Sequence, residues 1–230
     1  SDRAAELLQL LQLERIDTRI WRGQNEARFG ARLFGGQVLA QALVAASNTV
    51  APDRHCHSLH GYFLRPGRAD IPVIYQVESI RDGKSFTTRR IKAIQNGEAI
   101  FSMDTSFHTQ EPGLEHQIDM QDIPEPESLV DDRDIATKPN DPNPQWTQRE
   151  RPFEVRSVFQ RGRPVEDDTS QPIWIRYQAN VPDVQSLHRY LLTYASDMSL
   201  VSTAVLPHRR DVQQNQLQVA SLDHALWLHH

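Results

Sequence analysis

Two residues, Asp197 and Ser221, have the types and the setting for proton-transfer chemistry. Asp197 lies in the run YASDMSLV, and no Lys or Arg occurs between Arg189 and Arg209. A carboxylate in apolar surroundings is costly unless it is hydrogen-bonded, and such a group can accept a proton. Ser221 begins a predicted strand after the helix predicted at Asp197, and its hydroxyl could orient a water molecule for Asp197. The pattern indicates general-base catalysis, with a helix-capping aspartate and an ordinary strand serine as the structural alternatives.

A group of potential metal ligands lies in the segment HCHSLH, His55–His60. Cysteine and histidine side chains are common zinc ligands. On a strand, however, His57 and His60 have opposite parity and point to opposite faces of the sheet. The sequence therefore predicts no metal site, and the histidines are interpreted as strand residues.

Further polar features have both a functional and a structural interpretation. Gly35-Gly36 could present backbone N–H groups to an oxyanion or phosphate, or could permit close packing. A nucleophilic Ser/His/Asp triad is less well supported, because no G-x-S-x-G elbow occurs, although Asp223 and His224 closely follow Ser221. A basic cluster could bind a phosphate-rich ligand or form a solvated strand face, and it comprises Arg81, Lys84, Arg89, Arg90 and Lys92.

The chain that must position these residues contains one pattern twice. In the first copy FGGQVLAQALVAASNTV precedes HSLHGYFLRPG, and in the second ASDMSLVSTAVLPH precedes VASLDHALWLHH. A repeat in fixed order predicts a duplicated domain. Gln37 lies 21 positions before Ser58, and Asp197 lies 24 positions before Ser221. Asp197 is therefore expected near the start of the repeated helix.

The first copy predicts an α+β unit. No charged residue occurs between Arg32 and Asp53, so the helix over residues 34–50 should be wrapped by other elements. Asp82-Gly83 and Asn96-Gly97 tolerate the positive φ of tight hairpins, which predicts an antiparallel meander. Strands are expected over residues 16–22, 58–64, 73–80, 86–95 and 99–108. We therefore expect a sheet that curls around a central helix.

The second copy follows a stretch with seven prolines, residues 111–152. This composition predicts a linker. The alternative is an ordered segment that packs over the first unit through Leu129 and Trp146. Beyond it, helical spacing over residues 186–205 is expected to break at Ser196-Asp197, with one continuous helix as the alternative. Strands are expected over residues 153–159 and 173–177.

These elements predict a first unit over residues 1–110, a linker over 111–152 and a second unit over 153–230. By comparison with the first unit, three more strands should follow Leu228. The second unit is therefore expected to be incomplete at its C-terminus. An open half-sheet leaves unpaired edges, so we expect it to need a partner for stability.

Composition excludes some classes of protein. The chain has 230 residues, 25 basic against 30 acidic, and a net charge of -5, which disfavours nucleic-acid binding. A single cysteine permits no intrachain disulfide and fits a reducing compartment. The first residues predict a short amphipathic helix, without an apolar run of signal-peptide or membrane-spanning length.

The motifs together resemble the acyl-CoA thioesterase II family of double hotdog thioesterases. The resemblance covers nearly the whole chain and rests on FGGQVLAQ, SLHGYFLRPG, RDGKSFTTRR, IQNG, YASDMSL and SLDHALWLH, in that order. It implies an α+β fold of two hotdog units in tandem. It also implies hydrolysis of fatty acyl-CoA to free fatty acid and coenzyme A, without a metal or another cofactor.

In that family an aspartate, a threonine or serine and a glutamine hold the attacking water. The first two match Asp197 and Ser221, whereas the glutamine would lie beyond His230, and a protein that ends there is expected to be inactive. The resemblance also implies a fatty acyl-CoA partner and a homodimer or homotetramer. We expect a cytoplasmic protein, and the incomplete C-terminus leaves a peroxisomal signal open.

Two other functions remain open. A hotdog acyl-CoA hydratase or dehydratase would use an Asp/His pair, and the lack of a histidine near Asp197 in the sequence weighs against it. A non-catalytic acyl-CoA binding protein would keep the fold without using a base.

Overall fold

The computed structural model describes residues 2–26, 30–135, 151–158, 170–208 and 219–229. Contacts divide the chain into two compact units. The sheet unit comprises residues 6–113, 181–198 and 221–230, and the hairpin unit comprises residues 1–5, 114–180 and 199–220. Segments from both sides of the predicted linker thus contribute to the sheet unit, which contains Asp197 and Ser221.

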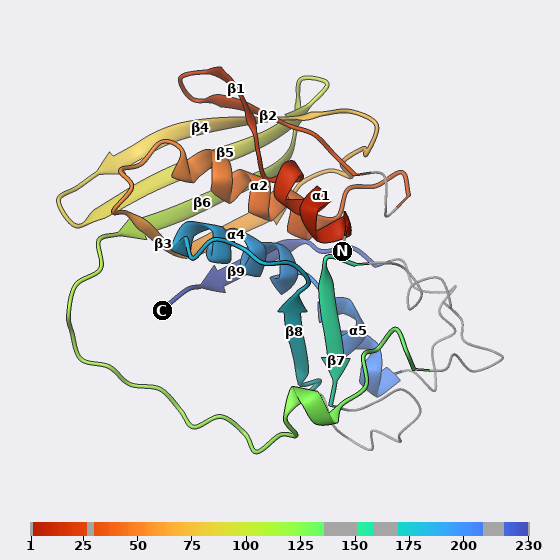
Figure 1. Cartoon of the computed structure of the whole chain (residues 1–230). Coiled ribbons are helices and arrows are strands. Elements are labelled where there is room, and N and C mark those ends of the chain that lie inside the picture. The colour runs from red at the N-terminus through yellow and green to blue at the C-terminus, as the bar shows by residue number, and fades with distance from the viewer. Residues whose placement is uncertain (1, 27–29, 136–150, 159–169, 209–218, 230) are drawn as a thin grey trace. The chain divides into compact units, whose positions relative to one another are not determined.

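A seven-stranded antiparallel sheet dominates the sheet unit (Figure 1). Its spatial order is β1-β2-β4-β5-β6-β3-β9. The predicted meander is confirmed, and Asn96 and Gly97, with φ of 51° and 80°, make the turn between its last two strands. The strands are β1 (Glu14–Asp17), β2 (Ile20–Gly23), β3 (His55–Phe63), β4 (Val73–Asp82), β5 (Phe86–Gln95), β6 (Glu98–His108) and β9 (Asp223–Trp227).

The single strand expected over residues 16–22 is wrong. Two strands, β1 and β2, form a hairpin there, and Thr18-Arg19 makes the connection between the paired residues Asp17 and Ile20. The sequence carries no Gly or Pro at this turn, so the usual signal was absent.

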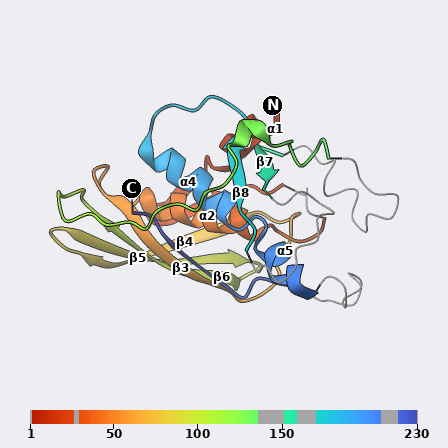
Figure 2. The same cartoon turned by 90° about the horizontal axis from the view of Figure 1, so that it is seen from below.

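Helix α2 (Gly35–Ser47) lies against one face of the sheet, as Figures 1 and 2 show. Residues 36–46 of the helix are all buried, which confirms the wrapped helix that its lack of charge predicted. Its apolar side chains pack against those of the strands, among them Tyr75, Ile91 and Phe101. This packing fixes the position of the N-terminus of α2.

Two glutamines in α2 are buried, and each has its hydrogen bonds satisfied. Gln41 accepts a bond of 2.8 Å from the Tyr75 hydroxyl and donates to the Leu10 and Gln24 carbonyls. Gln37 donates to Asn25 across 3.0 Å. Buried amides with partners carry little penalty, and these bonds tie the chain before α2 to the helix.

Helix α1 (Asp2–Leu10) and helix α4 (Gln185–Ser196) complete the ordered helices near α2. Leu7 and Leu11 are buried on one side of the N-terminal segment, as its amphipathic pattern predicted. Helix α4 runs beside α2 in both views (Figures 1 and 2). The predicted break after α4 is confirmed, because Ser199 has φ of 69° and the next helix, α5 (Leu200–Val205), begins after it.

The hairpin unit is built on the antiparallel pair β7 (Phe153–Ser157) and β8 (Ile173–Tyr177). A 3-10 turn, η2 (Pro126–Ser128), precedes the pair, and η3 (Leu206–His208) follows α5. Part of the predicted linker is bonded to this hairpin: Asp132 accepts two bonds from Ser157, of 3.0 and 2.7 Å, and Trp174 donates to the Pro124 carbonyl. Trp146, offered as an anchor, lies outside the described residues.

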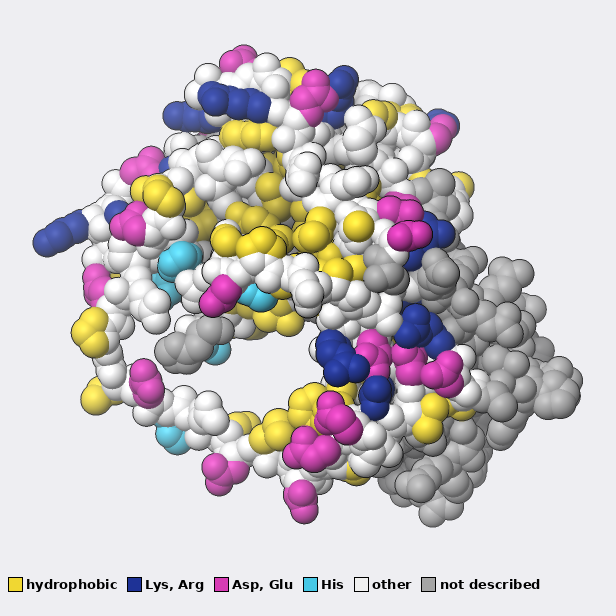
Figure 3. Space-filling model, in the orientation of Figure 1, with side chains coloured by type: hydrophobic (Ala, Val, Ile, Leu, Met, Phe, Trp, Pro, Cys, Tyr) yellow, Lys and Arg dark blue, Asp and Glu magenta, His cyan; other side chains and the backbone are white. Residues whose placement is uncertain are grey.

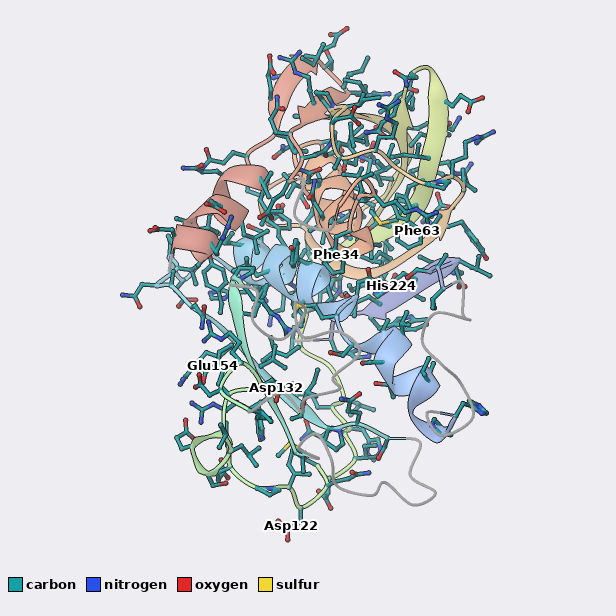
Figure 4. All side chains as sticks on the ribbon, turned by 90° about the vertical axis from the view of Figure 1, so that its right-hand side faces the viewer. Phe34, Phe63, Asp122, Asp132, Glu154 and His224 are labelled. Atoms are coloured by element: carbon teal, nitrogen blue, oxygen red, sulfur yellow. The ribbon has the colours of Figure 1, made fainter. Side chains whose placement is uncertain are left out.

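Charged side chains reinforce the hairpin. The Glu154 carboxylate accepts bonds of 2.5 Å from Arg156 and from Arg176, one on its own strand and one on β8. These guanidinium groups outweigh the effect of burial and lower the pKa of Glu154. Figure 4 shows Glu154 and Asp132 on and beside β7.

Candidate functional site

Asp197 lies at the C-terminal end of α4, where the helix stops. Its side chain is only 7% exposed. The residue is the C-cap of α4, and its backbone N–H bonds to the Ala195 carbonyl. Because α5 begins only at Leu200, the carboxylate does not occupy the N-cap that the structural alternative expected.

Ser221 lies next to this carboxylate. Its hydroxyl donates to Asp197 Oδ1 across 3.5 Å, the long limit of a hydrogen bond. Ser221 precedes β9, and the pairing of β9 with β3 fixes its place: Phe63 N–H donates to the Leu222 carbonyl across 2.9 Å. The two residues selected from the sequence therefore lie together, 24 positions apart in the chain.

His224 is the residue of this site that sequence reasoning missed. Its Nδ1 lies 3.7 Å from Asp197 Oδ1, and its Nε2 lies 3.0 Å from Ser196 Oγ. Its side chain is 6% exposed. Along the sequence no histidine lies near Asp197, which weighed against an Asp/His pair. In space this expectation is wrong, because β9 returns to the end of α4 and brings His224 beside Asp197. The D-H pair after Ser221 was the available signal.

The N-terminus of α2 closes the other side of the carboxylate. A Cβ added to Gly35 would lie 2.6 Å from Asp197 Oδ2 and 2.9 Å from the Phe63 ring. A Cβ on Gly36 would meet the Tyr194 carbonyl. The glycines therefore permit close packing, one of the two interpretations that the sequence left open. The positive end of the α2 dipole also lies beside Asp197, where it stabilises negative charge.

Aromatic rings surround this group of polar atoms. Phe34, which precedes α2, meets Tyr194 edge to face with ring centroids 5.0 Å apart, and Phe63 on β3 packs on Phe101 at 4.9 Å. Figure 4 labels Phe34 just before α2, Phe63 on β3 and His224 on β9. Apolar walls exclude water and strengthen the electrostatic interactions among the few polar groups inside.

The strand histidines do not form a metal site. His57 bonds to Ser106 across 2.8 Å, and His60 pairs with Asp223 at 3.0 Å. No group of three or more His, Cys, Asp or Glu side chains in the described parts of the chain could hold a metal ion. Cys56 is buried beside Thr105, and burial raises the pKa of its thiol to about 11.

The basic cluster is divided between two faces of the sheet. Arg89 is 3% exposed and bonds to Asp82 across 2.6 Å and to Thr49, whereas Arg90 pairs with Asp104 on the solvent side. Arg90 and Lys92 line a pocket together with Asp17 and Glu78. On the face of the molecule seen in Figure 3, Lys and Arg side chains also lie among Asp and Glu side chains. This distribution favours the solvated strand face over a phosphate site.

The described helices include none long and apolar enough to cross a membrane.

Comparisons with known proteins place the chain in a family. The family model described as the acyl-CoA thioesterase N-terminal domain matches residues 25–108, and the acyl-CoA thioesterase model matches residues 143–230. Acyl-CoA thioesterase 2 of Haemophilus influenzae is 36% identical over 100% of this chain and 82% of its own length. Human acyl-coenzyme A thioesterase 8 is 36% identical over 96% of this chain and 73% of its own length.

Solved structures agree with these matches. The crystal structure of the acyl-CoA thioesterase II TesB2 from Mycobacterium marinum superposes with a TM-score of 0.78 and 37% identity, over 98% of this chain and 79% of that one. A protein with a hot dog fold from Alicyclobacillus acidocaldarius has a TM-score of 0.72 and 19% identity, over 96% of this chain and 77% of that one. At this identity the match shows the fold alone. The fold is thus a hotdog fold, α+β with an antiparallel sheet, and the chain belongs to the acyl-CoA thioesterase family.

Proposed function

We propose that this protein hydrolyses fatty acyl-CoA thioesters to free fatty acid and coenzyme A, and that Asp197 activates the water. Family membership supports the reaction. The observation that carries the choice of base is the buried Asp197 carboxylate with the Ser221 hydroxyl at 3.5 Å, among aromatic side chains. A carboxylate so placed can remove a proton from a water that the hydroxyl holds.

The reaction then proceeds in two steps. Asp197 takes a proton from water as the water oxygen attacks the thioester carbonyl carbon, and the carbonyl electron pair moves to its oxygen. The resulting oxyanion collapses, the C–S bond breaks, and the sulfur leaves as a thiolate that receives the proton from Asp197. Backbone N–H groups aimed at the oxyanion are the usual source of its stabilisation, and the α2 N-terminus beside Asp197 supplies such groups.

We propose that the hotdog units occur in tandem, with the limits 1–110, 111–152 and 153–230. Two separate family models match successive parts of the chain. Strand β9 pairs along the edge strand β3 over five residues, and α4 packs on α2. Edge-to-edge sheets with adjacent helices are the arrangement expected when one hotdog unit pairs with another.

We further propose that the protein assembles as a homodimer or homotetramer in the cytoplasm. The single cysteine fits a reducing compartment. A yeast relative is named a peroxisomal acyl-coenzyme A thioester hydrolase, 32% identical over 34% of this chain and 22% of its own length. Light scattering would give the mass of the assembly, and cell fractionation would give the compartment.

Hydration or dehydration of an acyl-CoA is the second candidate function. It is favoured by one observation, the His224 Nδ1 at 3.7 Å from Asp197, because such enzymes use an Asp/His pair. It predicts a change in enoyl thioester absorbance without release of a thiol. Family membership favours hydrolysis.

The test is release of free thiol from a medium-chain acyl-CoA by the full-length protein. We expect Asp197→Asn to lower kcat about 10²- to 10⁴-fold, the usual range for loss of a general base. Asp223→Asn is the matched control, because this carboxylate is exposed and pairs with His60 on the outer face. Thiol release that persists in Asp197→Asn, or altered acyl absorbance without thiol, would refute the proposal.

A further inference from the structure

The hydrogen bonds around His224 determine which ring nitrogen carries its proton. Ser196 Oγ lies 2.9 Å from the Thr193 carbonyl and 3.0 Å from His224 Nε2. A carbonyl can only accept, so both bonds form at the same time only when the single hydroxyl proton of Ser196 is donated to Thr193. The bond to His224 then requires Nε2 to donate to Ser196 Oγ. Nε2 therefore carries a hydrogen.

The other ring nitrogen faces a second acceptor. In a neutral imidazole with hydrogen on Nε2, Nδ1 presents a lone pair. That lone pair lies 3.7 Å from Asp197 Oδ1, which is also an acceptor when the carboxylate is ionised. Both side chains are buried, at 6% and 7% exposed, so a proton added to either of these two acceptors lies beside the other.

The geometry also selects the oxygen that receives the proton. Oδ2 is turned to Gly35, where a Cβ would lie at 2.6 Å. Oδ1 is the oxygen that meets both the Ser221 hydroxyl, at 3.5 Å, and His224 Nδ1. A water held by Ser221 would therefore transfer its proton to the oxygen that faces the imidazole.

We propose that His224 is a positioning residue of the thioesterase reaction, which shares through Nδ1 the proton that Asp197 removes from water. This inference rests on the proposed function of Asp197. When the water O–H bond breaks, the new O–H bond on Asp197 Oδ1 points to Nδ1, and the proton stays there while the oxyanion exists. It returns through Asp197 to the thiolate sulfur when the C–S bond breaks, so the pair ends each turnover as it began.

The elements packed around this pair contribute few side chains to it. On β3 the residue paired with His224 is Gly61, which contributes no side chain. On α4, Thr193 is fully buried and donates to the Arg189 carbonyl across 2.7 Å, while the Arg189 guanidinium is turned to the Cys56 carbonyl. On the outer face of β9, Asp223 pairs with His60. Ser196 and His224 are therefore hydrogen-bonded at the end of α4, with Asp197 Oδ1 3.7 Å from the imidazole.

The first test needs no substrate. In the ¹⁵N-labelled full-length protein, nitrogen chemical shifts and couplings report the tautomer of each histidine. We expect His224 to have hydrogen on Nε2, and we expect Ser196→Ala, which removes the acceptor, to change its nitrogen shifts. A His224 that carries hydrogen on Nδ1 alone while neutral would overturn the proposal, because that tautomer cannot accept a proton from Asp197.

The second test uses two amide replacements that divide the roles of the ring. His224→Gln places its side-chain amide near the position of Nε2, where it keeps a hydrogen-bond partner for Ser196. His224→Asn instead places an amide N–H near the position of Nδ1, where it can orient Asp197 but cannot accept a proton. We expect both to lower kcat by about 10- to 100-fold with little change in KM. Full activity in either variant would overturn proton sharing. His188→Gln, at an exposed position on α4, is the control.

A double-mutant cycle separates this inference from the proposed function. Since His224 acts only through Asp197, His224→Gln should add little to the loss caused by Asp197→Asn. Independent, multiplicative losses would overturn the positioning role while leaving Asp197 as the base. Wild-type activity in Asp197→Asn alone would instead refute the base. Urea unfolding of each variant identifies losses that come from a damaged fold.

Discussion

At the level of single residues, the proposed chemistry depends on the side chains of Asp197, Ser221 and His224. Asp197 Oδ1 accepts a hydrogen bond from the Ser221 hydroxyl and lies near His224 Nδ1, while Oδ2 lies against α2. The proposed mechanism gives each group a distinct role: base, water ligand and proton partner.

Replacement of Ser221 tests the water ligand. Ser221→Ala removes the hydroxyl that meets Asp197 and should lower kcat by about 10- to 100-fold, with a smaller effect on KM. Ser221→Thr keeps the hydroxyl and should recover most of the activity. Steady-state thiol release measures both. An alanine variant as active as the threonine variant would contradict the role.

Cys56 offers a prediction about reactivity. Burial raises the pKa of its thiol to about 11, so little thiolate exists at neutral pH. We expect a disulfide reagent at pH 8 to leave the native protein unlabelled and to label it rapidly in urea. Rapid labelling of the native protein would show that the thiol is accessible.

At the element scale, the site depends on close contact between α4 and the first turn of α2. The glycines at positions 35 and 36 permit that contact, and the pairing of β9 with β3 brings Ser221 and His224 to it. A small displacement of α4 would therefore change both packing and catalysis.

Replacement of either glycine tests this contact. In Gly36→Ala the new Cβ meets the Tyr194 backbone carbonyl, which cannot rotate away, so we expect a loss of about 1–3 kcal/mol in the free energy of unfolding. Gly35→Ala should instead displace Asp197 and the Phe63 ring, and lower kcat more than stability. Gly113→Ala, with open space around it, is the control. Urea unfolding with equal midpoints for all three would contradict the packing.

Elements with local signals could be predicted from the sequence, whereas contacts set by distant pairing could not. The uncharged run predicted the buried α2, Asn96-Gly97 predicted its hairpin, and comparison of the two copies of the repeat predicted the break after α4. The β1–β2 hairpin was missed because its turn lacks glycine and proline. His224 was missed because its place beside Asp197 depends on the register of β9 with β3, which no periodicity encodes.

At the scale of the whole molecule, histidines make stability depend on pH. Burial is the main cause that lowers the pKa of His55, and the positive charges of Arg189 and His108 lower it further. Burial is also the main cause for His57, followed by His108 and Arg189. The unfolded chain, with histidine near 6.5, therefore binds more protons than the folded protein below that pH.

The expected result is a fall in stability between about pH 7 and pH 5.5, before the carboxylates titrate. Urea midpoints measured across this range should decrease as the pH decreases, and the decrease should be smaller in His57→Gln. In contrast, Glu154 and Asp131, whose pKa values arginines lower, should affect stability only at more acidic pH. Midpoints that stay constant to pH 5.5 would contradict the histidine contribution.

The most direct test of water activation by Asp197 follows the oxygen atom that enters the fatty acid. With enzyme in excess over a fatty acyl-CoA in H₂¹⁸O, a single turnover shows whether the oxygen that enters the fatty acid comes from water or from Asp197. If Asp197 activates water, every fatty acid released in the first turnover carries one ¹⁸O. First-turnover acid that carries only ¹⁶O, with ¹⁸O appearing in Asp197, would show a covalent acyl-enzyme and contradict the account.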